Sequence, residues 1–138
     1  MLQPFDRAFN AAVLVLANRA CPRGWDVADE APASLEAGLA AFTRDGGRPT
    51  VWSGGSEATI FGDPEINYAF RAWHDATHYR LGAAFDYAGE QATCRAQCED
   101  VRALYGHGIM AQGFKRLLVT EIMGQLAYHM RTGEFPAD

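Results

Sequence analysis

The sequence predicts an α+β, mostly helical fold of about five helices, with one short β-hairpin before a helix that carries two histidines. Apolar residues recur at helical spacing over most of the chain, and helix-capping residues separate these segments. Strand-forming residues around paired glycines occur convincingly at one place only. With 138 residues, 49% of them hydrophobic and 21% charged, the chain fits a single globular domain, residues 1–138.

The N-terminal half is predicted to contain two helices and the hairpin. Helical spacing predicts the first helix over about residues 5–19, and the second lies in residues 31–44 with Ser34 as its N-cap. Residues 50–63, TVWSGGSEATIFGD, then predict two short strands joined by a tight turn at the glycines.

Three helices are predicted in the C-terminal half. The first is framed by Asp63 as a cap, by Pro64 at its first position and by Gly82 just after its end. The other two are predicted over about residues 89–105 and 112–131. The last helix is apolar nearly all round, so we expect it to be central.

Charge and cysteine content restrict the class of function. A net charge of −5 argues against a nucleic-acid partner, whose phosphates require a basic face, and suits a protein partner better. The odd number of cysteines and the absence of a basic leader predict a protein of the reducing cytoplasm. The apolar N-terminal run is too short to span a bilayer, and we expect Cys94 and Cys98 to be small core residues.

The histidine helix carries the candidate metal ligands. On a helical wheel, Asn67, Arg71, His74 and His78 fall within about 60° of arc, and Asp75 lies at the edge of that arc. Histidines four residues apart project from one face, about one turn apart, which lets one helix supply two ligands to a zinc-type ion. The alternative is two half-buried histidines that make ordinary hydrogen bonds.

Three further polar residues are predicted on apolar helix faces. Glu90 lies on the apolar face of the next helix, where a carboxylate without a partner is costly. A metal ion, or hydrogen bonds donated by histidines, would explain a carboxylate at this position. The alternative is a glutamate in the first turn of the helix, where the helix dipole favours a negative charge. Glu121 and Gln125 on the last helix are either a buried hydrogen-bonded pair that fixes packing, or Glu121 is a further metal ligand or a carboxylate that orients a histidine.

The hairpin, the sequence His74-Asp75-x-x-His78 and Glu90 on the following helix together resemble the core of the gluzincin metallopeptidases, whose motif is HExxH. The resemblance covers about residues 50–100. It implies that the two histidines and Glu90 bind zinc and that Asp75, one methylene shorter than the glutamate of the family, activates a water molecule.

Other resemblances concern shorter patterns or the whole chain. The His74-Asp75 dipeptide resembles the HD-type phosphohydrolases, in which both residues bind the metal, although no histidine precedes His74. The ferritin-like di-iron proteins are a more distant resemblance, because the chain has no ExxH. The chain as a whole resembles small uncharacterised proteins encoded by bacteriophages, which implies a bacterial or phage-infected host cell.

Two functions are predicted as alternatives. The first is a metal-dependent hydrolase, whose substrate is either a peptide or a small-molecule phosphoester. Two imidazoles and a carboxylate make zinc the expected divalent metal. The second is a non-enzymatic phage or bacterial interaction protein, in which the same side chains form a structural polar network with Glu121. The predicted roles in the first are metal binding by His74, His78 and Glu90, catalysis by Asp75 and Arg71, and support of the site by Glu121, Gln125 and Asn67.

Overall fold

The computed structural model describes residues 7–30, 32, 34–54 and 61–132, without the side chains of residues 125 and 127–132. The described part of the chain has five helices and two short strands, which confirms the mostly helical α+β fold. In order, these are α1 (Arg7–Ala20), β1 (Asp26–Ala28), α2 (Leu35–Arg44), β2 (Thr50–Trp52), α3 (Pro64–Leu81), α4 (Tyr87–Tyr105) and α5 (Ile109–Thr132).

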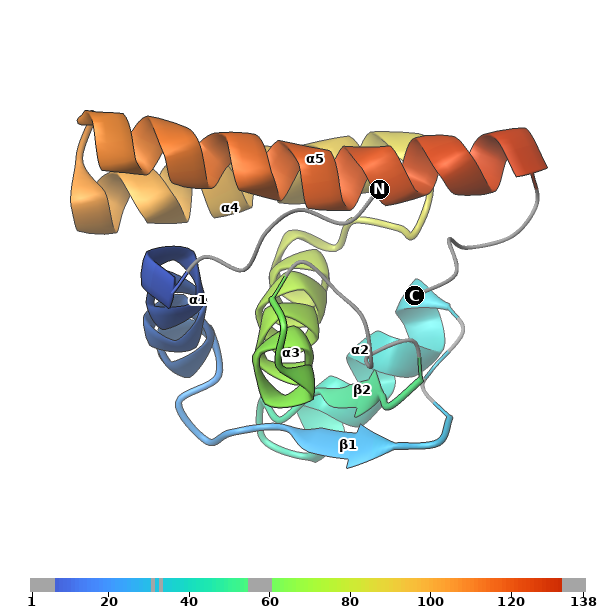
Figure 1. The fold of residues 1–138 in the computed structure, drawn as a ribbon. Helices are drawn as coiled ribbons and strands as arrows, with labels where there is room; N and C mark the ends of the chain where they lie inside the picture. Colours follow the sequence, from blue (N-terminus) through green and yellow to red (C-terminus); the bar gives the residue numbers. More distant parts are fainter. Residues whose placement is uncertain (1–6, 31, 33, 55–60, 133–138) are drawn as a thin grey trace.

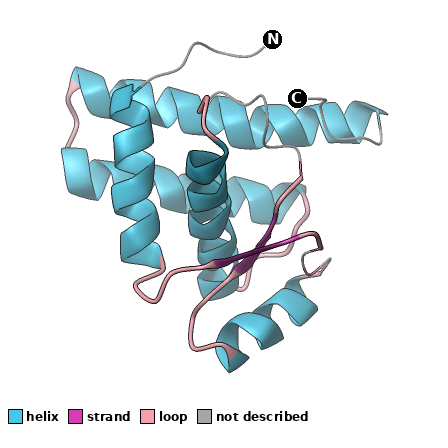
Figure 2. Cartoon of the chain, turned by 60° about the horizontal axis from the view of Figure 1, so that its bottom comes forward, coloured by secondary structure: helices cyan, strands magenta, loops and turns pink. Residues whose placement is uncertain are grey.

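The helices are arranged in layers around α3. Helices α4 and α5 lie side by side along their length, and α1 and α3 run across them (Figure 1). Helix α3 packs against α1, α2, α4 and β2, so it contacts more elements than any other described helix. Helix α2 and the two strands lie on the side of the molecule that is away from α4 and α5 (Figures 1 and 2), and the Phe42 ring of α2 packs on Tyr79 in the last turn of α3.

The two strands form a parallel pair, which differs from the predicted hairpin. Strand β2 begins at Thr50, as predicted, but its described partner is β1, with Val27 opposite Val51. Parallel strands need a crossover connection, and α2 provides it. Strand β1 is too short to show a strand pattern in the sequence. The second strand predicted for the hairpin falls largely on residues 55–60, outside the described residues.

The helix ends follow the predicted caps closely. The Asp63 side chain accepts a hydrogen bond from Glu65 N, Pro64 is the first residue of α3, and Gly82 is left-handed with φ of 65°. Ser34 caps α2 by accepting from Ala37 N. Helix α4 begins earlier than predicted, because Asp86 caps it by accepting from Gly89 N.

The main hydrophobic core lies between α1, α3, α4 and α5. Phe9 contacts the rings of Phe61 and Phe114 at centroid distances of 5.9 and 5.7 Å, and Trp73 and Leu118 are fully buried beside them. The expectation of a central last helix is wrong in part. One face of α5 joins this core, but Val119 on another face is 46% exposed. This second face of α5 points to solvent and has no helix packed on it in the described residues.

Candidate metal centre

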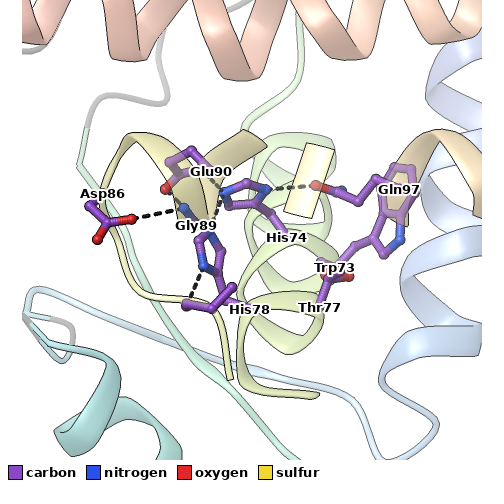
Figure 3. Close-up of polar contacts among 9 residues, drawn as sticks. Trp73, His74, Thr77, His78, Asp86, Gly89, Glu90 and Gln97 are labelled. Atoms are coloured by element: carbon purple, nitrogen blue, oxygen red, sulfur yellow. Dashed lines mark hydrogen bonds and ion pairs between the residues drawn. The ribbon is translucent and has the colours of Figure 1, made fainter. Parts of the chain in front are cut away.

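The candidate site is built by facing residues of α3 and α4. His74 and His78 lie one turn apart on α3, with ring centroids 4.6 Å apart, and Glu90 lies in the first turn of α4. Figure 3 shows that the two rings and the carboxylate turn toward one another. These are the three residues that the sequence predicted as metal ligands, and in the described part of the chain they are the ones that come together in a group able to hold a metal ion.

The distances between the three groups suit a small cation. His74 Nε2 lies 2.8 Å from Glu90 Oε2, and His78 Nε2 lies 3.1 Å from Glu90 Oε1. The two Nε2 atoms are 3.1 Å apart. Ligand atoms held about 2.0–2.1 Å from a tetrahedral zinc ion are separated by about 3.3 Å. An outward movement of a few tenths of an ångström would therefore give these three atoms the spacing of zinc ligands.

Hydrogen bonds on the far side of each ring assign its tautomer. His78 Nδ1 donates to the carbonyl oxygen of Ala83 at 2.8 Å, and His74 Nδ1 donates to Gln97 Oε1 at 2.6 Å. In a neutral imidazole with a hydrogen on Nδ1, Nε2 carries a lone pair. Two lone pairs and a carboxylate therefore face one another. Either a cation or added protons must lie among them, because acceptors alone would repel.

The chain between α3 and α4 holds the Ala83 carbonyl in place. After Gly82 reverses the chain, residues 83–86 return so close to α4 that a Cβ atom at Gly89 would lie 1.7 Å from Ala84 O. Asp86 Oδ1 accepts from Gly89 N at 2.8 Å, which fixes the start of the helix (Figure 3). The same turn thus positions both Glu90 and the acceptor for His78.

The site is enclosed by aromatic rings but reaches solvent on one side. The His78 side chain is 0% exposed, whereas those of His74 and Glu90 are 14% and 15% exposed. The Phe70 ring stacks on His74 and the Phe85 ring packs on His78, with centroid distances of 6.0 and 4.4 Å. Access from the side of His74 and Glu90 would leave room for a further ligand.

Without a metal ion, the three groups form a charged network. Burial alone would lower the pKa of His74, but the hydrogen bond and negative charge of Glu90 outweigh it, and the net shift is upward. Burial alone would raise the pKa of Glu90, but its hydrogen bonds to His74 and His78 lower it to about 2. Glu90 therefore stays ionised and available as a ligand at neutral pH.

Asp75 lies beside the cluster without bonding to it. In the described residues, no hydrogen bond joins its half-buried carboxylate to either histidine. Burial raises the pKa of Asp75 to about 6, against the opposing charges of His74 and His78. Burial, together with the charge of Asp75, raises the pKa of Tyr79. Asp75 therefore lies within electrostatic range of the cluster.

The other residues predicted for the site lie around it. The Arg71 guanidinium donates to the carbonyls of Trp52 and Gly54, which ties α3 to the end of β2. Asn67 is buried at 3% exposure, one turn before Arg71. Glu121 is buried on α5, and burial raises its pKa against the nearby charges of Arg71 and His74.

Gln125 was predicted as a site residue, and Gln97 was not. The Gln125 side chain lies outside the described residues, so its predicted role stays a prediction. Gln97, which was not predicted as a site residue, orients His74 from a fully buried position. The available signal was its spacing, because Gln97 follows Glu90 by two helical turns and shares its face.

Comparison with protein-family models, curated proteins and solved structures finds no match to this chain in any of the three. The fold and the cluster themselves therefore define the class: a mostly helical α+β protein with a group of two histidines and a glutamate that could hold a metal ion. No helix in the described ranges has the length and apolar character needed to cross a membrane.

Proposed function

We propose that the chain is a metal-dependent hydrolase in which His74, His78 and Glu90 hold one divalent ion, with zinc as the expected metal. One observation carries this proposal. Both imidazoles donate their Nδ1 hydrogens away from the cluster, so that their Nε2 lone pairs meet a carboxylate at 2.8 and 3.1 Å. Histidines that bind metals typically donate the other ring hydrogen to a carbonyl or carboxylate group in this way.

A bound divalent ion would supply Lewis-acid chemistry toward a water molecule and a substrate oxygen. The chain's own part is to hold three ligand atoms from two helices and to keep one side accessible. Ala83 O and Gln97 Oε1 fix the planes of the two rings, and the start of α4 fixes Glu90. A site of three protein ligands with one accessible side is typical of catalytic zinc, whereas structural zinc sites are closed.

Asp75 and Arg71 have the proposed catalytic roles. With a pKa of about 6, the Asp75 carboxylate is mainly ionised at neutral pH and could accept a proton from a water molecule. Arg71 would orient substrate or the segment that binds it, since it already holds the end of β2. The gluzincin resemblance favours a peptide substrate, and a guanidinium favours a phosphoester.

The first experiment is to measure metal content by mass spectrometry on protein purified without a histidine tag. We expect near-stoichiometric zinc or another divalent metal in the wild type and its loss in folded His74→Ala and Glu90→Ala. His107→Ala, which removes an exposed histidine away from the cluster, is the matched control and should retain the metal. Metal-loaded and metal-free protein are then compared on a chromogenic phosphoester and a fluorogenic peptide.

The alternative is a non-enzymatic interaction protein, and the direct contacts within the cluster favour it. Protonated histidines could satisfy Glu90 without any metal, as the raised pKa of His74 allows. In that case the wild type would contain no metal, and added zinc would not shift its melting temperature. His74→Ala would lower the stability of the fold without changing the metal content. That result would overturn the hydrolase proposal and direct the search to protein partners.

A further inference from the structure

A hollow of about 500 Å³ lies beside the start of α3, away from the metal cluster. The first half of α1 and the residues that begin α3 line it, among them Arg7, Asn10, Leu14, Asp63, Pro64 and Ile66. Asp63 precedes His74 by eleven residues, which is about 16 Å along the helix. The hollow has the volume of a small-molecule site and is separate from the cluster.

One buried polar atom in the wall of the hollow has no partner. Asn10 is 6% exposed, and its Nδ2 donates to Phe61 O at 2.6 Å, which orients the amide. Its Oδ1 accepts no hydrogen bond in the part of the chain that the structure describes. A buried acceptor in this state costs free energy. A hydrogen-bond donor that enters the hollow would remove that cost.

Charged groups of both signs lie at the hollow. The exposed Asp63 caps α3 with one carboxylate oxygen, which accepts from Glu65 N at 2.9 Å, and a carboxylate can accept further hydrogen bonds. The guanidinium of the exposed Arg7 carries five donors. The acceptors of Asn10 and Asp63 therefore suit an ammonium group, and Arg7 suits a carboxylate.

The remaining wall is apolar. Leu14 is 38% exposed, and Pro64 and the buried Ile66 line the hollow from the side of α3. An aliphatic group placed here would lose contact with water and would cover the exposed part of Leu14, which is favourable. The walls thus combine an acceptor pair, a cation and an apolar surface.

We propose that the hollow binds a free α-amino acid with an aliphatic side chain. The ammonium group of the ligand donates to Asn10 Oδ1 and to the Asp63 carboxylate, and Arg7 donates to the ligand carboxylate. The alkyl group packs on Leu14 and Pro64. Since an amino acid carries its two charged groups on one carbon atom, a single small molecule meets all of these requirements. Binding is non-covalent and needs no metal ion.

The test titrates ¹⁵N-labelled full-length protein with L-leucine in the presence of EDTA and follows the amide signals by NMR. L-Leucine should shift the Asn10 side-chain amide and the backbone amides of Gly62 and Glu65 in a saturable way. N-acetyl-L-leucine lacks the ammonium group and L-leucinamide lacks the carboxylate, so each should bind at least ~10-fold more weakly.

Two results of this titration would overturn the proposal. One is an Asn10 signal that does not move up to about 20 mM L-leucine, well above a millimolar dissociation constant. The other is equal affinity for L-leucine and both analogues, because an apolar contact alone would then explain binding. Neither result bears on the metal cluster, whose ligands are tested separately by metal content.

Variants of the two charged residues test their roles without removing the cap of α3. Asp63→Asn keeps a favourable N-cap residue, so α3 should still form, and Arg7→Gln changes an exposed position. Each should weaken L-leucine binding at least ~10-fold. The matched controls are Glu36→Gln at the start of α2 and Arg19→Gln at the far end of α1, both exposed. Undiminished binding in Asp63→Asn, or equal losses in the controls, would contradict the site.

Discussion

At the scale of single residues, the groups behind the two imidazoles decide what the cluster can do. The Ala83 carbonyl and the Gln97 amide oxygen take the Nδ1 hydrogens and leave both Nε2 atoms facing Glu90. If those acceptors were absent, the rings could turn or change tautomer, and the three ligand atoms would no longer converge. The ligands and the groups that orient them therefore act as one unit.

Gln97→Leu should weaken metal binding while leaving the three ligands in place. Loss of a group that orients a ligand typically reduces metal affinity by about 10–100-fold. Zinc competition titration measures the change, and the Nδ1–H signal of His74 in ¹⁵N NMR reports the tautomer.

Thr93→Val is the matched control, one turn before Gln97 on the same face of α4. Thr93 Oγ1 is buried with no hydrogen-bond partner in the described residues, so its removal should cost little. Similar losses of zinc affinity in both variants would show that packing, and not orientation of His74, explains the effect.

Asp75→Asn should stabilise the metal-free protein at pH 7.5 but not at pH 4. The folded-state pKa of about 6 lies above the ordinary value of 3.8, so the group contributes most stability below about pH 4 and loses it as pH rises toward 6. The expected gain is about 1–2 kcal/mol, since partial exposure reduces the full linkage value.

Urea unfolding at both pH values, with EDTA present, checks the effect of Asp75→Asn. The charge of Asp75 also raises the pKa of His74, so the difference between variant and wild type includes that interaction. An equal difference at the two pH values would contradict the raised pKa of Asp75.

At the scale of elements, the site depends on the turn that joins α3 to α4. Gly82 ends α3 in a left-handed conformation, and the capping residue Asp86 starts α4 only a few residues later. This short connection brings the first turn of α4 against the last two turns of α3. It is the reason that Glu90 meets histidines that precede it by twelve and sixteen residues.

Gly89→Ala tests this connection. A Cβ atom there would lie 1.7 Å from Ala84 O, which is backbone and cannot rotate away, so the turn must move outward. We expect a loss of about 2 kcal/mol or more in the free energy of unfolding. Zinc affinity should also fall, because Ala83 O moves with the turn.

Gly113→Ala is the control for helix propensity. A Cβ atom at this glycine in α5 meets nothing within 4 Å, so alanine should stabilise the protein by roughly 0.5–1 kcal/mol. Chemical denaturation of both variants measures the contrast. A stabilised Gly89→Ala variant would contradict the close approach of the turn to α4.

At the scale of the whole molecule, the cluster joins the central helix to the outer layer. Helix α3 lies between α1, α2 and β2 on one side and the α4–α5 layer on the other. A metal ion held by His74 and His78 of α3 and by Glu90 of α4 would cross-link the two parts. Metal binding should therefore stabilise the whole fold and not the site alone.

Saturating zinc should raise the melting temperature of the metal-free protein. Free zinc at 100 times its dissociation constant adds about 2.7 kcal/mol, which corresponds to a rise of several degrees for a domain of this size. Removal of the metal with a chelator should reverse the shift. Differential scanning fluorimetry with increasing zinc measures both changes.

His78→Ala should abolish the zinc-dependent shift, since this ligand is fully buried at the cluster. His107→Ala should keep the shift, because His107 is exposed and outside the cluster. A shift that survives in His78→Ala would place the bound zinc elsewhere on the protein.

Local sequence features were sufficient to predict the helices and the three candidate ligands, but not strand β1. Caps at Asp63 and Gly82 and the four-residue spacing of the histidines are local features, and local backbone chemistry is sufficient to predict their consequences. Glu90 was also predicted, because an acidic side chain on an apolar helix face needs a partner wherever that face is packed.

The tertiary structure was needed to show which strand pairs with β2 and which groups contact the two histidines. The parallel pairing of β1 with β2 depends on the crossover through α2, and the sequence of a three-residue strand does not encode its neighbour. Gln97 and the Ala83 carbonyl join the site because α3 and α4 meet at one angle and distance. Helix packing sets both, and the periodicity of a single helix shows which face is buried but not what lies opposite.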